Sequence, residues 1–228
     1  MDQRGRGRSH PPLSGSSSFS QHDYLSFDIP KAIELVKERT GAKKISIVTH
    51  SWGGVLVNAS LLLNPHLISS IAKISHISVK RRISVINLHR LFYIDLMWTL
   101  VGNLFIATKG CLPKNAYGPE GESRHTLKDI QRWVYQRRWI DKARDINYEN
   151  LAKKHKLPPC LYLTGKKDKC LGHIRDVTDF ALESGHTLED VHLLSKENGH
   201  KEDYDHVNIL TSKSAPSDHF NWIADFLA

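Results

Sequence analysis

The first periodic segment of the chain predicts a helix preceded by a loop. Residues 9–20 are rich in Ser, Pro and Gly, which is typical of a loop. Asp28 is a suitable N-cap for the following helix, and Gly41 is a suitable end. One face of this helix carries Ile29, Ile33 and Val36. The helical period therefore extends over about three turns before it breaks.

The next segments alternate between strand and helix. The β-branched run Lys43–Thr49 predicts a buried strand, and His50–Gly54 predicts a sharp turn. Val55–Leu63 then predicts a helix, which Asn64-Pro65 ends, and Ile71–Val79 predicts a second strand. A helix, strand, turn, helix, strand order indicates a parallel sheet covered by helices, and hence the α/β class.

The same alternation returns near the end of the chain. A strand is predicted at Cys160–Leu163, after two prolines, and another at Val191–Leu194. Helices are predicted at Ile174–Glu183 and Ser217–Leu227. These segments extend the same parallel sheet, so the residues between the two alternating regions form an insertion.

The middle of the chain has a different pattern. Residues 83–108 are more apolar than a helix on a sheet needs to be, residues 109–123 are loop-like, and residues 124–155 form a charged helical region. The run Lys80-Arg81-Arg82 just before them predicts a solvated turn. The apolar excess suits a lid over an apolar pocket, or plain packing against the core.

Composition limits the class of protein and of partner. The chain has 228 residues, 40% of them hydrophobic and 25% charged, which suits one globular domain, with or without a lid. The formal net charge is +8, but the basic residues are scattered and no nucleic-acid-binding motif accompanies them. We therefore expect no nucleic-acid partner. Three cysteines without a C-x-x-C pair favour a reducing compartment, and we expect a cytoplasmic location.

Neither a targeting segment nor a metal site is predicted. Arg4, Arg6 and Arg8 are not followed by an apolar stretch, so no secretory signal is expected. The longest uncharged apolar stretch, Leu96 to Thr108, is shorter than the about 18 residues that span a bilayer. The fourteen histidines show no metal-ligand spacing, and we expect neither a metal nor another cofactor.

The turn around Ser51 is the most informative chemical feature. A serine between a strand and a helix is exposed above the sheet and can act as a nucleophile. Gly53 meets the requirement for a small neighbour, whereas Thr49 replaces the glycine that usually precedes such a serine. The backbone N–H of Trp52, at the start of the helix, is placed to stabilise an oxyanion.

A serine nucleophile needs a base, and the base needs an acid that orients it. In parallel α/β sheets that carry a serine on such a turn, the three residues follow along the chain in the order Ser, Asp or Glu, His. Asp168 lies just after the predicted strand at Cys160–Leu163, where such a carboxylate belongs. His200 and His206 both follow the last predicted strand, and the pattern of residues alone does not decide between them.

Four segments resemble the α/β-hydrolase superfamily, especially lipase- and esterase-like members near the lysosomal acid lipases and polyhydroxyalkanoate synthases. Residues 2–9 resemble the D-x-R-G-x-G-x-S loop, and residues 28–41 the helix that starts D-[IL]-P and ends in T-G. Residues 49–54 resemble G-H-S-x-G-G. The tail from His206 to Asn208 resembles the catalytic H-[LV]-D segment, although Asn208 replaces the family Asp, and Asp205 stands where Gly is common. The resemblance favours His206 as the base.

The resemblance also implies a domain organisation. Residues 1–82 and 156–228 would form two parts of the core, and residues 83–155 a helical cap between them. Because residues 2–9 match the loop after the fourth strand, the first strands and the second oxyanion donor would lie upstream of Met1. A sheet without those strands would have an apolar edge that favours aggregation.

These observations predict a serine hydrolase acting on a small apolar ester or lipid, with Ser51 as nucleophile, His206 as base and Asp168 as acid. Two alternatives remain. The chain could be a non-catalytic or incomplete member of the fold that lacks the second oxyanion donor, or an acyltransferase that uses the same triad. The apolar cap is a candidate for peripheral contact with a membrane.

Overall fold

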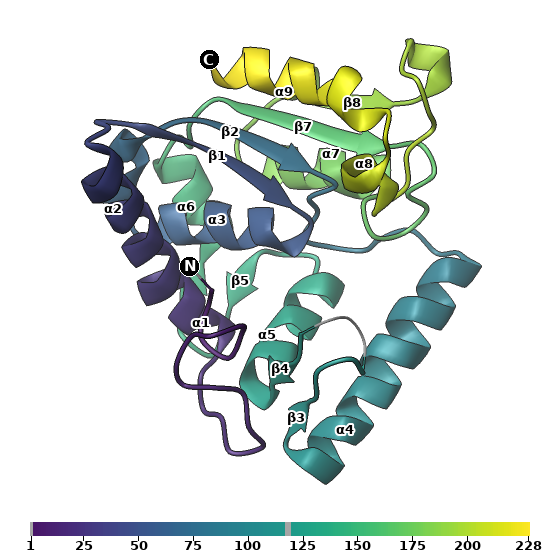
Figure 1. Cartoon of the computed structure of the whole chain (residues 1–228). Helices are drawn as coiled ribbons and strands as arrows, with labels where there is room; N and C mark the ends of the chain where they lie inside the picture. Colours follow the sequence, from purple (N-terminus) through teal and green to yellow (C-terminus); the bar gives the residue numbers. More distant parts are fainter. Residues whose placement is uncertain (1, 117–119) are drawn as a thin grey trace.

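The computed structural model describes residues 2–116 and 120–228. A four-stranded parallel sheet, in the order β1-β2-β7-β8, forms the centre of the fold (Figure 1). Its strands are β1 (Ile45–His50), β2 (Ile71–Ile77), β7 (Cys160–Gly165) and β8 (Val191–Leu194). The α/β class, the four strands and their parallel pairing are thus as the sequence predicts. All four strands end at one edge, which is where parallel sheets place their sites.

Helices cover both faces of this sheet (Figure 1). On one face, α9 (His219–Leu227) packs on apolar side chains of β7 such as Leu161 and Leu163. On the other face, α3 (Trp52–Leu63) and α7 (Ile174–Glu183) pack on Cys160 and Tyr162. Successive residues of β7 therefore face opposite helical layers, as strand geometry requires.

Other elements complete these layers. α2 (Ile29–Thr40) packs on α3 through Ile33, and α8 (Asn208–Thr211) precedes α9. Short 3₁₀ turns lie at Pro65–Ser70, Leu188–Asp190, Lys196–Asn198 and Ala215–Ser217.

The N-terminal helix begins earlier than its periodicity predicts. Ser20 starts a continuous helical run through α1 (Gln21–Asp23), a π-helical turn (Tyr24–Asp28) and α2. Asp28, predicted as the N-cap, is instead inside the helix with φ −70° and ψ −46°. Its carboxylate accepts hydrogen bonds from the backbone N–H of Arg4 at 3.0 Å and from the Arg4 guanidinium at 2.6 Å. The carboxylate is thus used to hold the N-terminal loop.

Residues 78–159 form the connection between β2 and β7. It contains a π-helical segment, Arg90–Val101, which continues into α4 (Gly102–Lys109); we call this continuous element the long apolar helix. The connection also holds α5 (Arg124–Tyr135) and α6 (Tyr148–Lys154). Two small antiparallel ladders pair β3 (Cys111–Leu112) with β4 (Glu122–Ser123), and β5 (Ile140–Asp141) with β6 (Ile146–Asn147).

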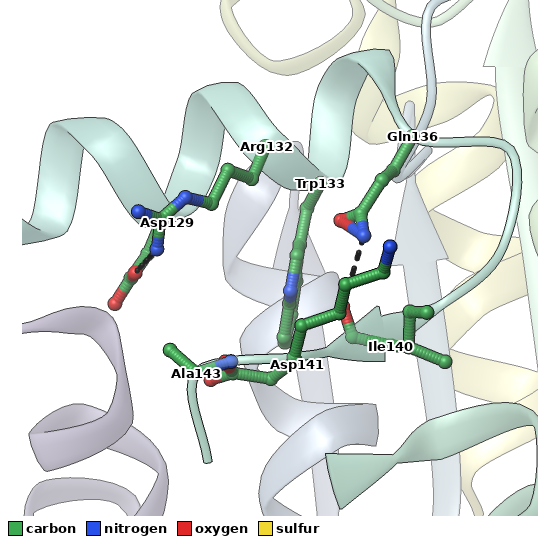
Figure 2. A pocket seen from close by; sticks show the side chains of 8 residues that line it. Asp129, Arg132, Trp133, Gln136, Ile140, Asp141 and Ala143 are labelled. Atoms are coloured by element: carbon green, nitrogen blue, oxygen red, sulfur yellow. Dashed lines mark hydrogen bonds and ion pairs between the residues drawn. The ribbon is translucent and has the colours of Figure 1, made fainter. Parts of the chain in front are cut away.

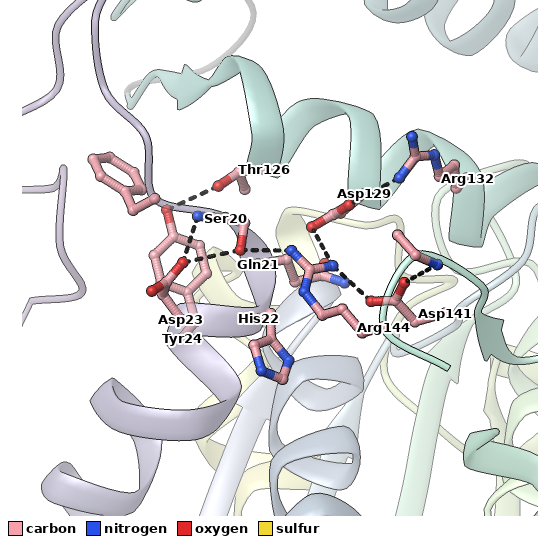
Figure 3. A network of polar contacts seen from close by, with 12 residues as sticks. Ser20, Gln21, His22, Asp23, Tyr24, Thr126, Asp129, Arg132, Asp141 and Arg144 are labelled. Carbon is pink, nitrogen blue, oxygen red and sulfur yellow. Dashed lines mark hydrogen bonds and ion pairs between the residues drawn. The ribbon is translucent and has the colours of Figure 1, made fainter. Parts of the chain in front are cut away.

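A polar network attaches this connection to the N-terminal helix. The Arg144 guanidinium donates to the Ser20 hydroxyl at 3.0 Å and to the carboxylates of Asp141 at 2.7 Å and Asp129 at 3.5 Å (Figure 3). The Ser20 backbone N–H in turn donates to Asp23 Oδ2 at 2.8 Å, at the start of the helix. The network therefore joins α1 to α5 and β5, which lie more than 100 positions further along the chain.

The basic run before the connection is not the solvated turn that the sequence predicts. Lys80 is 4% exposed and Arg81 is fully buried. Arg81 finds its acceptors on other elements, because its guanidinium binds Glu183 of α7 and the carbonyl oxygens at the end of α5. A short sequence window does not reveal such distant partners.

The long apolar helix, Arg90–Lys109, corrects the expectation about membrane spans. By length and composition, this helix is long and apolar enough to cross a membrane, and it is the one such helix among the described residues. In the fold, 17% of its most apolar window is buried. The sequence pattern missed it because Asp95 interrupts the uncharged stretch. In this fold the helix rests on α5, where Tyr135 Oη donates to Asp95 at 2.7 Å and pairs with the Thr99 hydroxyl at 2.8 Å.

Candidate active site

Ser51 occupies a sharp turn between β1 and α3, as predicted. Its backbone lies at φ 51°, a positive value that side chains other than glycine rarely adopt, and ψ −131°. The Ser51 N–H donates to the Ile77 carbonyl at 2.9 Å, which holds the turn against the end of β2. Trp52 is the first residue of α3, so its backbone N–H has no acceptor within the helix.

Close packing at this turn involves Gly54 and not Gly53. A Cβ added at Gly53 would meet nothing within 4 Å, whereas one at Gly54 would lie 2.5 Å from Val79 and 2.7 Å from His76 Nδ1. The role that the sequence assigned to Gly53 therefore belongs to its neighbour. Thr49 is accommodated because its hydroxyl lies 2.6 Å from His76 Nδ1, in a buried polar pair.

The structure brings Ser51, His206 and Asp168 together. Ser51 Oγ lies 3.0 Å from His206 Nε2, and His206 Nδ1 lies 2.6 Å from Asp168 Oδ2. The three residues come from the ends of β1 and β7 and from the loop after β8, at the carboxyl edge of the sheet. The hydroxyl can thus donate to the imidazole, which donates to the carboxylate.

Asp168 is buried at the end of β7, with a relative exposure of 4%. Burial tends to raise the pKa of its carboxyl group, but the hydrogen bond and charge of His206, the N–H of Gly172 and the charge of Lys80 together lower the pKa below its ordinary value. A Cβ at Gly172 would lie 2.4 Å from Asp168 Oδ2, so this close approach requires glycine. Asp168 is therefore an ionised, buried acceptor.

The loop carrying His206 is braced by the residues that depart from the family pattern. Asp205 Oδ1 accepts the backbone N–H groups of Val207 at 2.8 Å and Asn208 at 2.7 Å. Asn208 Oδ1 accepts the Asp205 N–H at 2.5 Å. The two side chains thus fix the turn that presents the imidazole.

His50 is a site residue that the sequence analysis missed. Its Nε2–H donates to the His206 carbonyl at 2.9 Å, and the two ring centroids are 4.7 Å apart. Burial, and then the neighbouring His206, lowers the pKa of His50. A neutral His50 therefore supports the backbone of His206. The one feature of the sequence that indicates a role for His50 is its position directly before Ser51.

The alternative base, His200, lies in a different environment. Its Nδ1 is 2.9 Å from Asp218 Oδ1, and its ring stacks on Trp222 at 6.3 Å between centroids. No hydrogen bond between His200 and either Ser51 or Asp168 occurs in the described part of the chain. His200 thus belongs to the packing of the C-terminal helix.

Two cavities adjoin the Ser51–His206–Asp168 group. One, of about 300 Å³, contains Ser51, Trp52 and Lys80. Its other lining residues are Arg6, Ile83, Ile94, Trp98, Glu122, Ile130, Val134 and Leu171. The other, of about 340 Å³, is lined by His206 and Asp168 together with Tyr93 and two lysines. The long apolar helix borders both cavities, because it contributes Ile94 and Trp98 to the first and Tyr93 to the second.

A larger cavity, of about 440 Å³, lies elsewhere in the β2–β7 connection (Figure 2). Trp133 of α5 and Ile140 of β5 line it, and Gln136 Nε2 donates to the Ile140 carbonyl at 3.3 Å across it. It contains none of the predicted site residues. Within residues 2–116 and 120–228, no group of three His, Cys, Asp or Glu side chains could hold a metal ion.

Comparisons with solved structures identify the fold. The chain is similar to a carboxylesterase structure from the thaumarchaeon Nitrososphaera gargenis, with a TM-score of 0.56 and 12% identity over 99% of this chain and 78% of that one. It is also similar to an alpha/beta fold family hydrolase from Bacillus anthracis, with a TM-score of 0.52 and 15% identity over 100% of this chain and 80% of that one. A meta-cleavage product hydrolase from Pseudomonas fluorescens gives a TM-score of 0.50 and 16% identity, over 99% and 77% of the two chains.

The sequence comparisons agree with this fold. A family model described as alpha/beta hydrolase fold matches residues 1–102, which include the Ser51 turn. A search of curated proteins finds no match. The family match over residues 1–102, the parallel sheet and the similar hydrolase structures lead to one conclusion: this chain has the α/β-hydrolase fold.

Proposed function

We propose that the protein is a serine hydrolase that cleaves an apolar carboxylic ester. Ser51 Oγ attacks the ester carbonyl carbon while His206 Nε2 takes the hydroxyl proton. Asp168 holds the imidazole in the required tautomer and stabilises the imidazolium that forms. The observation that carries this proposal is the hydrogen-bonded series Ser51–His206–Asp168, with distances of 3.0 and 2.6 Å.

The remaining steps use the same groups. The Trp52 N–H would donate to the oxyanion that develops on the carbonyl oxygen. His206 then gives its proton to the departing alcohol, which leaves an acyl group on Ser51. His206 then deprotonates a water molecule, which attacks the acyl carbon. The bond from this carbon to Ser51 Oγ breaks, the carboxylic acid is released, and Ser51 Oγ takes the proton back from His206.

The two cavities suit the two parts of an ester. The cavity beside Ser51 is lined mainly by apolar side chains and fits an acyl group. The cavity at His206 has the exposed residues Lys167 and Lys169 and fits the departing alcohol. In this proposal the long apolar helix acts as a lid, since it borders both.

An activity-based experiment tests the proposal. We expect a fluorophosphonate probe to label the wild-type chain and the His200→Ala variant, and Ser51→Ala to remove the labelling. His206→Ala should lose hydrolysis of p-nitrophenyl esters, while His200→Ala should keep most of it. Labelling that persists in Ser51→Ala, or activity that depends on His200 and not on His206, would contradict the assignment.

We also propose that the lid helix contacts a lipid surface, in a protein that works in the cytoplasm with Cys111, Cys160 and Cys170 reduced. All three cysteines are free and buried. Several apolar side chains along the helix are exposed: Leu91, Phe92, Tyr93, Leu96, Leu100 and Leu104. An apolar face on a protein of net charge +8 suits an anionic membrane surface.

Vesicle flotation tests this contact. We expect the protein to float with vesicles that contain phosphatidylglycerol, and Leu100→Asp with Leu104→Asp to abolish flotation. Leu182→Asp with Leu188→Asp, which changes two exposed leucines outside the helix, is the matched control and should float like the wild type. Equal flotation of both variants would refute a specific role for the helix.

A further inference from the structure

Lys80 is a buried cation in the wall of the Ser51 cavity. It lies three residues beyond the end of β2 and is 4% exposed, yet it lines the same cavity of about 300 Å³ as Ser51 and Trp52. The backbone before it is fixed, because the Ser78 N–H donates to the Leu163 carbonyl at 2.7 Å. The position of Lys80 is therefore set by the edge of the sheet.

The Lys80 ammonium group has no bonded partner in the described residues, 2–116 and 120–228: no hydrogen bond or ion pair joins it to any of them. Asp168 and Asp176 act on Lys80 through their charge and form no hydrogen bond or ion pair with it among the described residues, although Asp176 Oδ2 is itself buried without a hydrogen-bond partner. Asp168 binds His206, and Asp176 Oδ1 accepts the Ser84 N–H at 3.0 Å. Neighbouring Arg81, by contrast, is fully paired.

Electrostatics agree with this geometry. Burial lowers the pKa of Lys80, whereas the charges of Asp168, Cys170 and Asp176 raise it. An unpaired buried charge is costly to a fold, and buried charges normally have a partner. A ligand anion in the cavity would supply that partner.

The rest of the cavity wall defines the shape of such a ligand. The other charged residues of the wall, Arg6 and Glu122, form an ion pair with each other, in which Arg6 Nε and Glu122 Oε2 have no further hydrogen-bond partner in the described residues. The remaining wall is mostly aliphatic and aromatic: Trp52, Ile83, Ile94, Trp98, Ile130, Val134 and Leu171. The cavity thus offers apolar surface together with one unpaired cation, which suits an apolar chain with a single negative charge. A phosphate dianion would bring two negative charges to a wall that has one unpaired cation.

We propose that Lys80 binds a carboxylate on the acyl part of the substrate, so that the enzyme prefers esters whose acyl chain carries a second, free carboxyl group. This inference rests on the proposed function of Ser51. The ion pair would anchor the far end of the chain and hold the ester carbonyl beside Ser51 Oγ, so Lys80 determines specificity.

Two matched ester series test the inference. p-Nitrophenyl esters of unbranched neutral acids are compared with p-nitrophenyl hemiesters of the dicarboxylic acids from succinic to suberic. For at least one chain length, we expect wild-type kcat/KM to be higher for the hemiester. Lys80→Met should lower the hemiester-to-neutral ratio by about 10- to 100-fold, the value of a charged hydrogen bond in a dry site. Lys80→Arg, which keeps the charge, should restore part of the ratio.

Two controls separate this role from others. Lys44→Met removes an equal charge from an exposed residue at the opposite end of β1 and should leave the ratio unchanged. Lys80→Met should unfold at the wild-type temperature or above it, because it removes an unpaired buried charge. A large fall in unfolding temperature would assign Lys80 to the fold and overturn the inference.

The remaining outcomes are equally distinct. If the wild type hydrolyses neutral esters but prefers no hemiester, or if Lys80→Met lowers both series equally, the inference fails and the proposed function stands. If neither series is hydrolysed and the fluorophosphonate probe does not label Ser51, the proposed function itself fails.

Discussion

Arg81 uses every N–H donor of its guanidinium to attach the end of β2 to α7 and to the end of α5. Its Nε donates to Glu183 Oε2 at 2.8 Å, and one terminal nitrogen donates to the carbonyl oxygens of Trp133 at 2.6 Å and Gln136 at 3.0 Å. The other terminal nitrogen donates to the Arg137 carbonyl at 3.0 Å and also binds Glu183. The side chain of Arg81 is fully buried, so water cannot replace these bonds.

The substitution Arg81→Met would leave the Glu183 carboxylate and three carbonyl oxygens without their donor. Removing one partner of a buried ion pair costs about 3–5 kcal/mol. In a domain of this size, each kcal/mol lowers the unfolding temperature by about 2–4 °C. We therefore expect the midpoint to fall by about 6–20 °C. Arg81→Lys should lose most of the same amount, because an ammonium group cannot reproduce the planar set of donors.

Differential scanning calorimetry measures this effect, with Arg82→Met as the matched control. Arg82 is half-buried and has no ion pair with any residue that the structure describes, so its replacement should change stability by about 0.5 kcal/mol or less. Adding Glu183→Met to Arg81→Met should recover part of the loss, since it removes the unpaired carboxylate. A midpoint for Arg81→Met equal to that of the control would refute the reasoning.

Three further predictions concern the site and its support. His50→Phe removes the donor to the His206 carbonyl and should lower kcat about five- to tenfold with little change in KM, measured on a p-nitrophenyl ester; an unchanged kcat would exclude a positioning role. Gly54→Ala places a Cβ 2.5 Å from a neighbouring side chain and should lower the free energy of unfolding by about 1–3 kcal/mol, whereas Gly53→Ala should be neutral or stabilising; urea titration distinguishes them, and equal effects would contradict the packing. Burial lowers the pKa of His76 to about 3, so below about pH 6.5 the unfolded chain binds a proton that the folded chain does not, and stability falls as the pH drops toward 3. Between pH 7 and pH 5 this histidine alone should cost about 2 kcal/mol, and His76→Asn should flatten the measured dependence by that amount; an equally steep dependence in the variant would exclude His76 as its source.

The sequence is sufficient to predict the parallel sheet, because alternating strand and helix periods are local signals that each segment carries by itself. The proximity of Ser51, Asp168 and His206 also follows from it, since residues at the ends of parallel strands meet at one edge. The choice of His206 over His200 required the resemblance. The difference between the two lies in a distant partner, Asp218, which the spacing of residues does not show.

The predictions from the sequence that the structure contradicts have a common physical cause. Asp28, Arg81 and Lys80 are polar residues whose surroundings are built by elements far away in the chain, so their local sequence resembles a cap or a solvated turn. The long apolar helix was underestimated for a related reason. Its one acidic residue, Asp95, is neutralised by contacts with Arg90 and Tyr135 that a hydropathy pattern does not include.

The bond from Arg144 to Ser20 also has a consequence for how the protein is made. The two residues are 124 positions apart, so Ser20 leaves the ribosome long before its partner exists. At synthesis rates of about 5–20 residues per second, the first helix waits about 6–25 seconds for this contact. The Ser51–His206 pair spans 155 positions and forms later still. The nascent chain therefore acquires its chemistry only after His206 has been synthesised, and until then its apolar N-terminal segments are natural clients for chaperones.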